Sequence, residues 1–341
     1  MYIVGRNSTF AYSLTLTGDN VTIFGIKGKS IIKHPAGMPA TSVCILRVDN
    51  SNYTTIRDLT FNGNWGATVG VTTTNAGINH ADQVDPKNYG LMIRGSKATL
   101  VSNCFFTQIY SDAVWIGAAS GDFTQASVNT AILDCQIDIT ARDGIAVAQN
   151  ADGVGVYRTR VTNVFAQAFD MEPIGQNQYA RNVTVDSCYL GNWWDKANVA
   201  RTGNCPVSIV GGSVYSANPS NYARRVTLTN CDIDSSVYVN TAIDVTISNN
   251  RIWADFTGTS YAPVCVEGFV DGLYITNNSI YDRTSSPGQR HDASIDIHLV
   301  ASSSNNAQAQ NAWVLNNTIY CRSEEHTSEL QSRQYLVCRL L

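Results

Sequence analysis

One pattern recurs in Leu228-Thr-Asn-Cys231-Asp-Ile233, in Ile247-Ser-Asn-Asn250-Arg-Ile252 and in Ile275-Thr-Asn-Asn278-Ser-Ile280. Each copy has an apolar residue, two further residues, a small or buried residue, one more residue and a final apolar residue. The second half alternates with a period of two, as a β-strand does. The Asn before the buried position suits a left-handed bend, because Asn tolerates that backbone conformation and hydrogen-bonds to its own main chain. The pattern therefore predicts a sharp turn that leads into a strand.

The same pattern extends over most of the 341 residues. Further copies lie at Ile56–Phe61, Leu100–Phe106, Ile132–Ile137, Val156–Val161, Val185–Leu190 and Val314–Ile319. A second short strand with apolar first and third residues recurs before the copies, as in Val114–Ile116 and Phe169–Met171. Units of this size cannot bury an apolar face alone, so they stack into a continuous core. The sequence predicts an all-β fold, a single-stranded parallel β-helix of about ten coils.

The residues at the turn stack from coil to coil in such a solenoid. We expect the Asn and Asp side chains of the turns to form an amide ladder along the axis. The next position places Cys104, Cys135, Cys188 and Cys231 in one inward column. Free Cys is a good small core residue. A disulfide or a metal site is the alternative interpretation, although the spacings match no zinc pattern.

The coils resemble those of the pectate-lyase-like right-handed parallel β-helix superfamily. Asn20–Lys33 resembles an early coil of such proteins, Ile56–Asn64 the next one, and the resemblance extends to about Tyr320. It implies a right-handed solenoid. It also implies two chemistries, because hydrolases of the superfamily use clustered aspartates, whereas its lyases use Lys or Arg as the base and often calcium. The Asn-Thr-Asp, Asp-Asp, Gly-His-Gly and Arg-Ile-Lys motifs of its pectin-hydrolysing branch do not occur here.

Composition limits the function classes and the domain organisation. Hydrophobic residues make up 44% of the chain, charged residues 15%, and the net charge is −4 without a basic stripe, which argues against nucleic acid as a partner. No apolar run approaches membrane-spanning length. We expect one β-helix domain at 1–321, truncated at both ends. The segment 322–341 is expected to be a non-native tail, because it resembles a translated sequencing adapter.

Strand alternation identifies the side chains that leave the core. The outward pairs of successive coils are Cys44/Leu46, Met92/Arg94, Trp115/Gly117, Ala146/Ala148, Asp170/Glu172, Ser208/Val210, Tyr238/Asn240, Cys265/Glu267 and Asp296/His298. Asp170 and Glu172 are two residues apart, so their Cα atoms lie about 6.5–7 Å apart and both carboxyls project from one face. Depending on the side-chain rotamers, the two carboxyls could take the separation of either a retaining or an inverting glycosidase. This coil is the predicted catalytic site, with Asp143 as a third acid.

Small neighbours and aromatic residues surround the predicted acids. Trp115 and Tyr238 lie two coils away on either side, about 10 Å from the acid pair at the usual strand spacing. Their rings are candidates for stacking on sugars. Trp193 and Trp194 are adjacent in an expected loop, which suggests that they form a wall of the site or pack over the edge of the coil. The remaining candidate substrate-binding residues are Trp193, Trp194, Arg94, Asp112 and Lys196.

Three functions remain open from the sequence. The first is an extracellular polysaccharide-cleaving glycoside hydrolase, in which Asp170 and Glu172 act as acid and base or nucleophile and Asp143 tunes their pKa values. The second is a uronate lyase, in which Arg142, Lys196 or Arg201 is the base and acids hold calcium. The third is a non-catalytic glycan-binding adhesin or a tail-spike-like protein on a virion surface. A homotrimer is compatible with the third but has no sequence signal.

Overall fold

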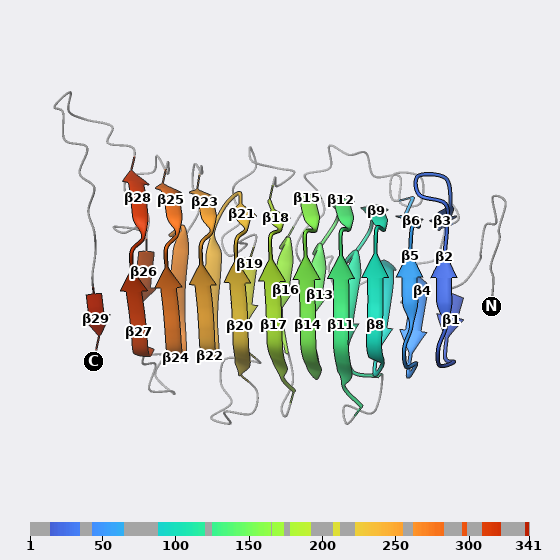
Figure 1. Ribbon diagram of the computed structural model, residues 1–341, viewed down its shortest axis with the longest axis horizontal. Helices are drawn as coiled ribbons and strands as arrows, with labels where there is room; N and C mark the ends of the chain where they lie inside the picture. Colours follow the sequence, from blue (N-terminus) through green and yellow to red (C-terminus); the bar gives the residue numbers. More distant parts are fainter. Residues whose placement is uncertain are drawn as a thin grey trace.

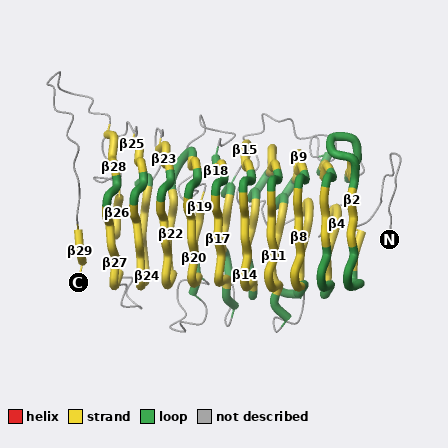
Figure 2. Tube along the Cα trace, viewed as in Figure 1, coloured by secondary structure: helices red, strands yellow, loops and turns green. Residues whose placement is uncertain are grey.

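The computed structural model describes residues 14–34, 43–64, 88–119, 125–164, 166–173, 178–191, 207–211, 222–254, 262–282, 295–298, 309–321 and 338–340. In these ranges strands alternate with turns, and there is no helix that could cross a membrane (Figure 2). The strands lie side by side in successive coils, with β1 (Leu14–Leu16) and β28 (Thr318–Cys321) at opposite ends (Figure 1). The described part of the chain is therefore a solenoid.

Each coil contributes strands to three parallel ladders. The first ladder contains β1, β4 (Val43–Asp49), β7 (Asn88–Arg94), β10 (Val114–Gly117), β13 (Ile145–Val147), β16 (Phe169–Met171), β19 (Val207–Val210), the first parts of β22 (Val237–Ser248) and β24 (Val264–Thr276), and β26 (Ile295–His298). The second contains β2 (Thr22–Phe24), β5 (Thr55–Arg57), β8 (Lys97–Ser102), β11 (Ser127–Leu133), β14 (Ala151–Tyr157), β17 (Ala180–Asp186), β20 (Ala223–Thr229), the second parts of β22 and β24, and β27 (Ala309–Leu315).

The third ladder contains β3 (Ile31–Lys33), β6 (Thr60–Asn62), β9 (Phe105–Ile109), β12 (Gln136–Thr140), β15 (Arg160–Val164), β18 (Tyr189–Leu190), β21 (Asp232–Ile233), β23 (Arg251–Ala254), β25 (Ser279–Asp282) and β28. The short strand β29 (Cys338–Leu340) pairs antiparallel to β27. The buried apolar residues of all three ladders form one continuous cluster along the axis. The predicted parallel β-helix is therefore confirmed.

The predicted left-handed turns lie between the second and third ladders. Every turn residue of the clear copies has a positive φ, between 51° and 59°. They are Asp58, Asn103, Asp134, Ser187, Asn230, Asn249, Asn277 and Asn316. The structure adds further left-handed bends that the sequence pattern did not reveal, for example at Asn129 and Asn182 near the start of second-ladder strands. Several bends per coil explain why the chain is so rich in Asn.

Asn277 offers a test of the turn. Its side chain is exposed and its φ is 57°, so a substitution there changes backbone strain with little effect on packing. We expect Asn277→Val to lower the free energy of unfolding by about 1–2 kcal/mol, the cost of a left-handed L-residue. Asn277→Gly should retain the stability of the wild type, because Gly enters this region freely. Urea unfolding measures both, with Thr276→Val in the neighbouring strand as the control; equal effects of all three substitutions would contradict the strain argument.

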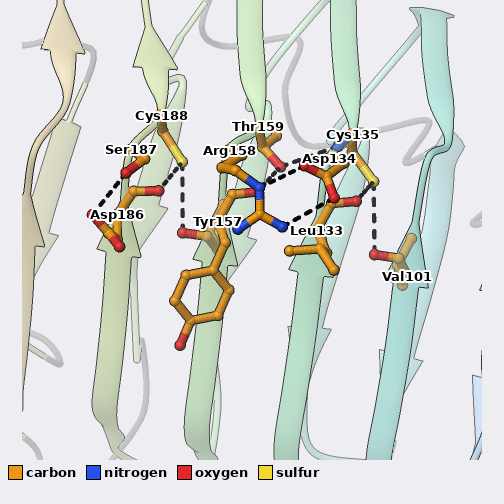
Figure 3. Close-up of polar contacts among 11 residues, drawn as sticks. Val101, Leu133, Asp134, Cys135, Tyr157, Arg158, Thr159, Asp186, Ser187 and Cys188 are labelled. Carbon is orange, nitrogen blue, oxygen red and sulfur yellow. Dashed lines mark hydrogen bonds and ion pairs between the residues drawn. The ribbon is translucent and has the colours of Figure 1, made fainter.

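The inward position after the turn is buried as predicted. Cys104, Cys135, Cys188 and Cys231 are 2–3% exposed, and none forms a disulfide. The Cys135 and Cys188 thiols donate to the carbonyl oxygens of Val101 and Val156 in the preceding coil, at 3.7 and 3.5 Å (Figure 3). In Figure 3 Thr159 occupies the same position between the two cysteines. The column is a set of core residues whose polar atoms bond to backbone.

The amide ladder lies one residue further along than predicted. It is made by the inward residues Asn250, Asn278 and Asn317, not by the turn residues before them. Asn278 Nδ2 donates to Asn317 Oδ1 at 2.9 Å, and Asn250 Nδ2 donates to Asn278 Oδ1 at 3.1 Å. Because these amides are buried, each needs a partner, and the next coil supplies it. The exposed turn residues can hydrogen-bond to water instead.

The register of the first ladder confirms the predicted outward columns from β7 onward. Asp170 pairs with Ala146 on one side and Ser208 on the other. The prediction for β4 was wrong: Leu46 is fully buried and pairs with Leu91. The outward pair of that strand is Arg47 and Asp49, which pair with Met92 and Arg94. The continuous apolar run before Arg47 made its alternation ambiguous.

Candidate functional site

The candidate site lies at the corner between the third and first ladders. Short turns there lead from β9, β12 and β15 into β10, β13 and β16. Asp112 and Asp143 occupy equivalent positions in two successive turns and are fully buried. The Asp143 backbone N–H donates to Asp112 Oδ1 at 3.3 Å, and the Gln167 N–H donates to Asp143 Oδ1 at 3.0 Å. These two carboxyls therefore support the backbone of the next coil, which is a structural role.

Arg142 holds the acids of this corner together. Its guanidinium lies 3.3 Å from Asp112 Oδ2, 3.3 Å from Asp143 Oδ2 and 2.8 Å from Glu172 Oε2. Asp112 and Asp143 are its buried partners, whereas the Glu172 side chain is 40% exposed. The Arg142 guanidinium is thus ion-paired with two carboxyls inside the protein. It also contacts the carboxylate of Glu172, which is accessible to solvent.

Asp170 has a different environment from Glu172, although both lie on the outward face of one strand. Asp170 is only 4% exposed, and the hydroxyl of Ser208 on β19 donates a hydrogen bond to it. Its outward position is as predicted, but exposure at the surface does not follow from alternation alone. The two carboxyls therefore lie beside each other, one buried and one half-exposed beside Arg142.

The environment of the cluster shifts several pKa values. Burial raises the pKa of Asp170 well above its usual range, and the charges of Asp143 and Glu172 add to this effect. Burial also raises the pKa of Asp143, against the opposing ion pair with Arg142. The neighbouring acids, Asp112 first, raise the pKa of Arg142. The cluster contains more acids than bases, and Asp170 has no direct contact with Arg142 among the ion pairs described.

Tyr89 belongs to the site and was not predicted from the sequence. Its ring is 6% exposed and tilted against Trp115, with centroids 6.4 Å apart. Burial raises the pKa of its phenol, and the charge of Asp112 raises it further. The signal was available, because Tyr89 precedes the first apolar residue of its strand by two positions, as Asp112 and Asp143 do in theirs. Arg142 was considered only as a lyase base, and its contacts with three acids were not foreseen.

Trp115 and Tyr238 lie two strands from Asp170 on either side, as predicted. Trp115 pairs with Ala146, which pairs with Asp170, and Tyr238 pairs with Ser208 on the other side. Both rings are half-buried. The Trp115 indole folds over Gly117, where a Cβ would lie 2.5 Å from the ring.

The hydroxyl of Tyr238 is fixed by two polar contacts. It donates to Glu267 Oε2 at 2.8 Å and accepts from Asn240 Nδ2 at 2.7 Å. The ring of Tyr238 is therefore held in place before any ligand arrives.

The remaining predicted residues are not all placed. Arg94 is mostly buried and ion-paired with Asp49 at 2.6 Å, three strands from Glu172 along the ladder. Trp193, Trp194 and Lys196 lie outside the described residues. Within the described ranges, no three side chains of His, Cys, Asp or Glu converge on a position for a metal ion. Asp143 and Glu172, two of the acids considered for calcium, instead contact Arg142.

Comparison with known proteins identifies the fold. No protein-family model matches the sequence, and no curated protein matches it either. The structure is similar to the A-module of the Azotobacter vinelandii mannuronan C-5 epimerase AlgE6, with a TM-score of 0.61 and 16% identity, over 89% of this chain and 72% of that one. It is also similar to PfbA, a surface adhesin of Streptococcus pneumoniae, with a TM-score of 0.58 and 14% identity, over 89% and 69%.

A third similar structure is the GH136 lacto-N-biosidase of Eubacterium ramulus, with a TM-score of 0.50 and 12% identity, over 93% of this chain and 61% of that one. These neighbours are right-handed parallel β-helix proteins, as the sequence predicted. Their identities of 12–16% show the fold alone. What this chain does must therefore be argued from its own site.

Proposed function

We propose that this chain is a polysaccharide-cleaving glycoside hydrolase that acts outside the cell or on a virion surface. Asp170 is the general acid, and Glu172 is the general base or nucleophile. One observation carries the proposal: two carboxyls on the same strand face have opposite environments. Asp170 is buried, and its burial raises its pKa, whereas Glu172 accepts a hydrogen bond from Arg142 at 2.8 Å and is 40% exposed. Acid–base cleavage of a glycosidic bond requires two carboxyls in different environments, one that can hold a proton and one that can accept a proton or attack.

The other residues of the corner support these roles. The charge of Asp143 contributes to the raised pKa of Asp170. Ser208 fixes the Asp170 carboxyl through its hydroxyl. The half-buried rings of Trp115 and Tyr238, two strands away on either side, are suited to stack on sugars that flank the cleaved bond. Ala146 lies beside Asp170 on the neighbouring strand.

The experiment is a screen of the full chain against neutral and acidic polysaccharides. New reducing ends without unsaturated products are expected, and Glu172→Gln should lower the rate at least about 100-fold. The matched control is Asp232→Asn, because Asp232 is 38% exposed and ion-paired with Arg251, as Glu172 is with Arg142. An equal loss of rate in both variants would contradict the role of Glu172.

Two alternatives have distinct outcomes in the same screen. Unsaturated products that disappear on addition of a chelator would indicate a calcium-assisted lyase. The raised pKa of Arg142 disfavours that route, because it keeps the guanidinium protonated and so unable to accept a proton. Binding of a glycan without turnover would indicate an adhesin, an alternative favoured by the burial of Asp170 and by the backbone contacts of Asp143.

A further inference from the structure

A loop that joins β2 to β3 is longer than the equivalent turn of the next coil. Six residues, 25–30, separate β2 from β3, whereas only Asp58 and Leu59 separate β5 from β6. Figure 1 shows this loop between β2 and β3 at the blue end of the solenoid. The next coil turns from the second to the third ladder in two residues, so the extra residues need an explanation other than the path of the solenoid.

The tip of the loop has a defined conformation. The Lys29 N–H donates to the Ile26 carbonyl at 2.8 Å, and the Ile26 N–H donates to Ser30 Oγ at 2.9 Å. Gly28, the third residue of this turn, has a φ of 71°, as that position of a type II turn requires. Lys27 and Lys29 flank it, and both are exposed. Because the turn is already formed, binding through it costs little conformational entropy.

Three large apolar side chains in and beside the loop are exposed to solvent. Phe24 is 42% exposed, Ile26 66% and Ile31 53%. The other large hydrophobic residues that are exposed in the described part of the chain are all tyrosines. The inward residue Ile23 of the same coil is only 4% exposed, so this apolar surface is not the open end of the core.

The equivalent outward positions of the next coil are polar. Arg57 pairs with Phe24 in the second ladder, and Thr60 pairs with Ile31 in the third. The apolar residues are therefore a property of this loop and its flanks and not of the repeat. Exposed apolar residues that gather in one place mark a surface that another molecule covers.

The same segment is basic. The chain has six lysines, and three of them, Lys27, Lys29 and Lys33, lie here. All three are exposed. No acidic residue occurs between Asp19 and Asp49. The segment is thus positively charged in a chain whose net charge is −4.

We propose that this loop and its flanks dock the end of the solenoid on a phospholipid bilayer that contains anionic lipids. The apolar side chains enter the boundary between headgroups and acyl chains, while the lysine ammonium groups remain beside the phosphates. A soluble anion would pair with the lysines but leave the apolar side chains in water. An apolar protein groove would cover the apolar side chains but leave the lysines without counter-ions. A bilayer interface supplies both environments.

The charge distribution limits the contact to this end. The rest of the chain is acidic overall, because the net charge remains negative despite the three lysines, and an anionic surface repels it. No residue of the candidate site takes part, so the inference does not depend on the proposed hydrolase.

The test is titration of the full chain with vesicles of equimolar phosphatidylcholine and phosphatidylglycerol, with vesicles of phosphatidylcholine alone for comparison. The chain should bind the anionic vesicles more tightly, and high salt should weaken this binding because ions screen the lysines. Each lysine beside an anionic bilayer strengthens binding about five-fold, so Lys27→Gln combined with Lys29→Gln should weaken it about 25-fold. Ile26→Ser should weaken it about ten-fold, because an apolar side chain no longer leaves water.

Two variants elsewhere on the solenoid are the matched controls. Lys97→Gln removes an exposed lysine of β8, and Tyr274→Ser removes an aromatic side chain of β24 that is 40% exposed. Both should bind the anionic vesicles as the wild type does. Circular dichroism of every variant should match that of the wild type, because all the replaced side chains are exposed.

Insertion is measured separately with Ile26→Trp. The indole fluorescence that it adds to the wild-type signal should move to shorter wavelength with anionic vesicles, and brominated acyl chains should quench it. Failure of the wild type to bind anionic vesicles, or equal binding by the double lysine variant, would overturn the proposal. An indole that stays in water while the chain binds would overturn it too, because binding would then be purely electrostatic.

Discussion

Replacing Asp170 with Asn should strongly slow polysaccharide cleavage and also make the protein more stable at neutral pH. Loss of a general acid lowers the rate by about 10²- to 10⁴-fold. Asn is nearly isosteric with Asp and can still accept the hydrogen bond from Ser208. It carries no charge, so the cost of burying an ionised carboxylate that is 4% exposed disappears. A gain of stability together with a loss of activity is typical of a catalytic site in which a residue needed for the chemistry destabilises the fold.

The pH dependence of the effect follows from the direction of the pKa shift. The pKa of Asp170 in the folded protein is raised above its unfolded value of about 3.9. The stability that its protonated form contributes is fully present below that unfolded pKa and is lost as the pH rises through the folded pKa. The advantage of Asp170→Asn should therefore be small near pH 4 and grow towards neutral and alkaline pH. The pKa of Asp143 is raised in the same direction, so the free energy of unfolding of the variant should still fall somewhat as the pH rises.

Urea midpoints of the wild type and Asp170→Asn between pH 4 and pH 9 measure this difference, alongside cleavage rates. Asp152→Asn is the control, because Asp152 is more exposed and pairs with Arg181 on the second ladder. It should change neither the rate nor the pH slope. If Asp170→Asn cleaves as fast as the wild type, Asp170 is not the acid. If the variant is less stable at every pH, the carboxylate is stabilised by contacts and the argument from burial is wrong.

Much of the fold could be predicted because each coil of the solenoid repeats the same turn and the same short strands. The turn at Asn249 or Asn277 requires a residue that tolerates positive φ, and the position after it requires a small buried side chain. Period-two alternation then fixes which residues of each first-ladder strand leave the core. Asp170 and Glu172 were placed on one face, with Trp115 and Tyr238 two strands away, by these rules alone.

Alternation could not predict what covers an outward side chain. It separates core-facing from outward residues, and Asp170 satisfies that rule while being almost fully buried. The same limit applies to the cluster around Arg142. Its partners Asp112 and Glu172 lie on either side of it at the corner, and only the path of the turn brings them together. A flexible side chain such as Arg142 reaches several neighbours, so its partners depend on tertiary geometry.

The second large effect is expected at Arg142. Arg142→Met retains most of the side-chain volume but leaves Asp112 and Asp143, both fully buried, without their counter-ion. Removing one partner of a buried ion pair typically costs 3–5 kcal/mol, and we expect the free energy of unfolding at pH 7 to fall by about that amount. The loss should shrink as the pH falls, because protonation neutralises the carboxyls that remain.

Urea unfolding at pH 7 and pH 5 tests this expectation. Arg158→Met is the matched control, since Arg158 also pairs with an acid, Asp134, but both side chains are exposed; its midpoint should equal that of the wild type. Adding Asp143→Asn to Arg142→Met should recover part of the lost stability, because it removes one of the unpaired buried charges. A small loss in Arg142→Met at pH 7 would mean that the buried acids already hold protons in the wild type. In that case the protons of the cluster would lie on Asp112 and Asp143, and the assignment of Asp170 as the general acid would be contradicted.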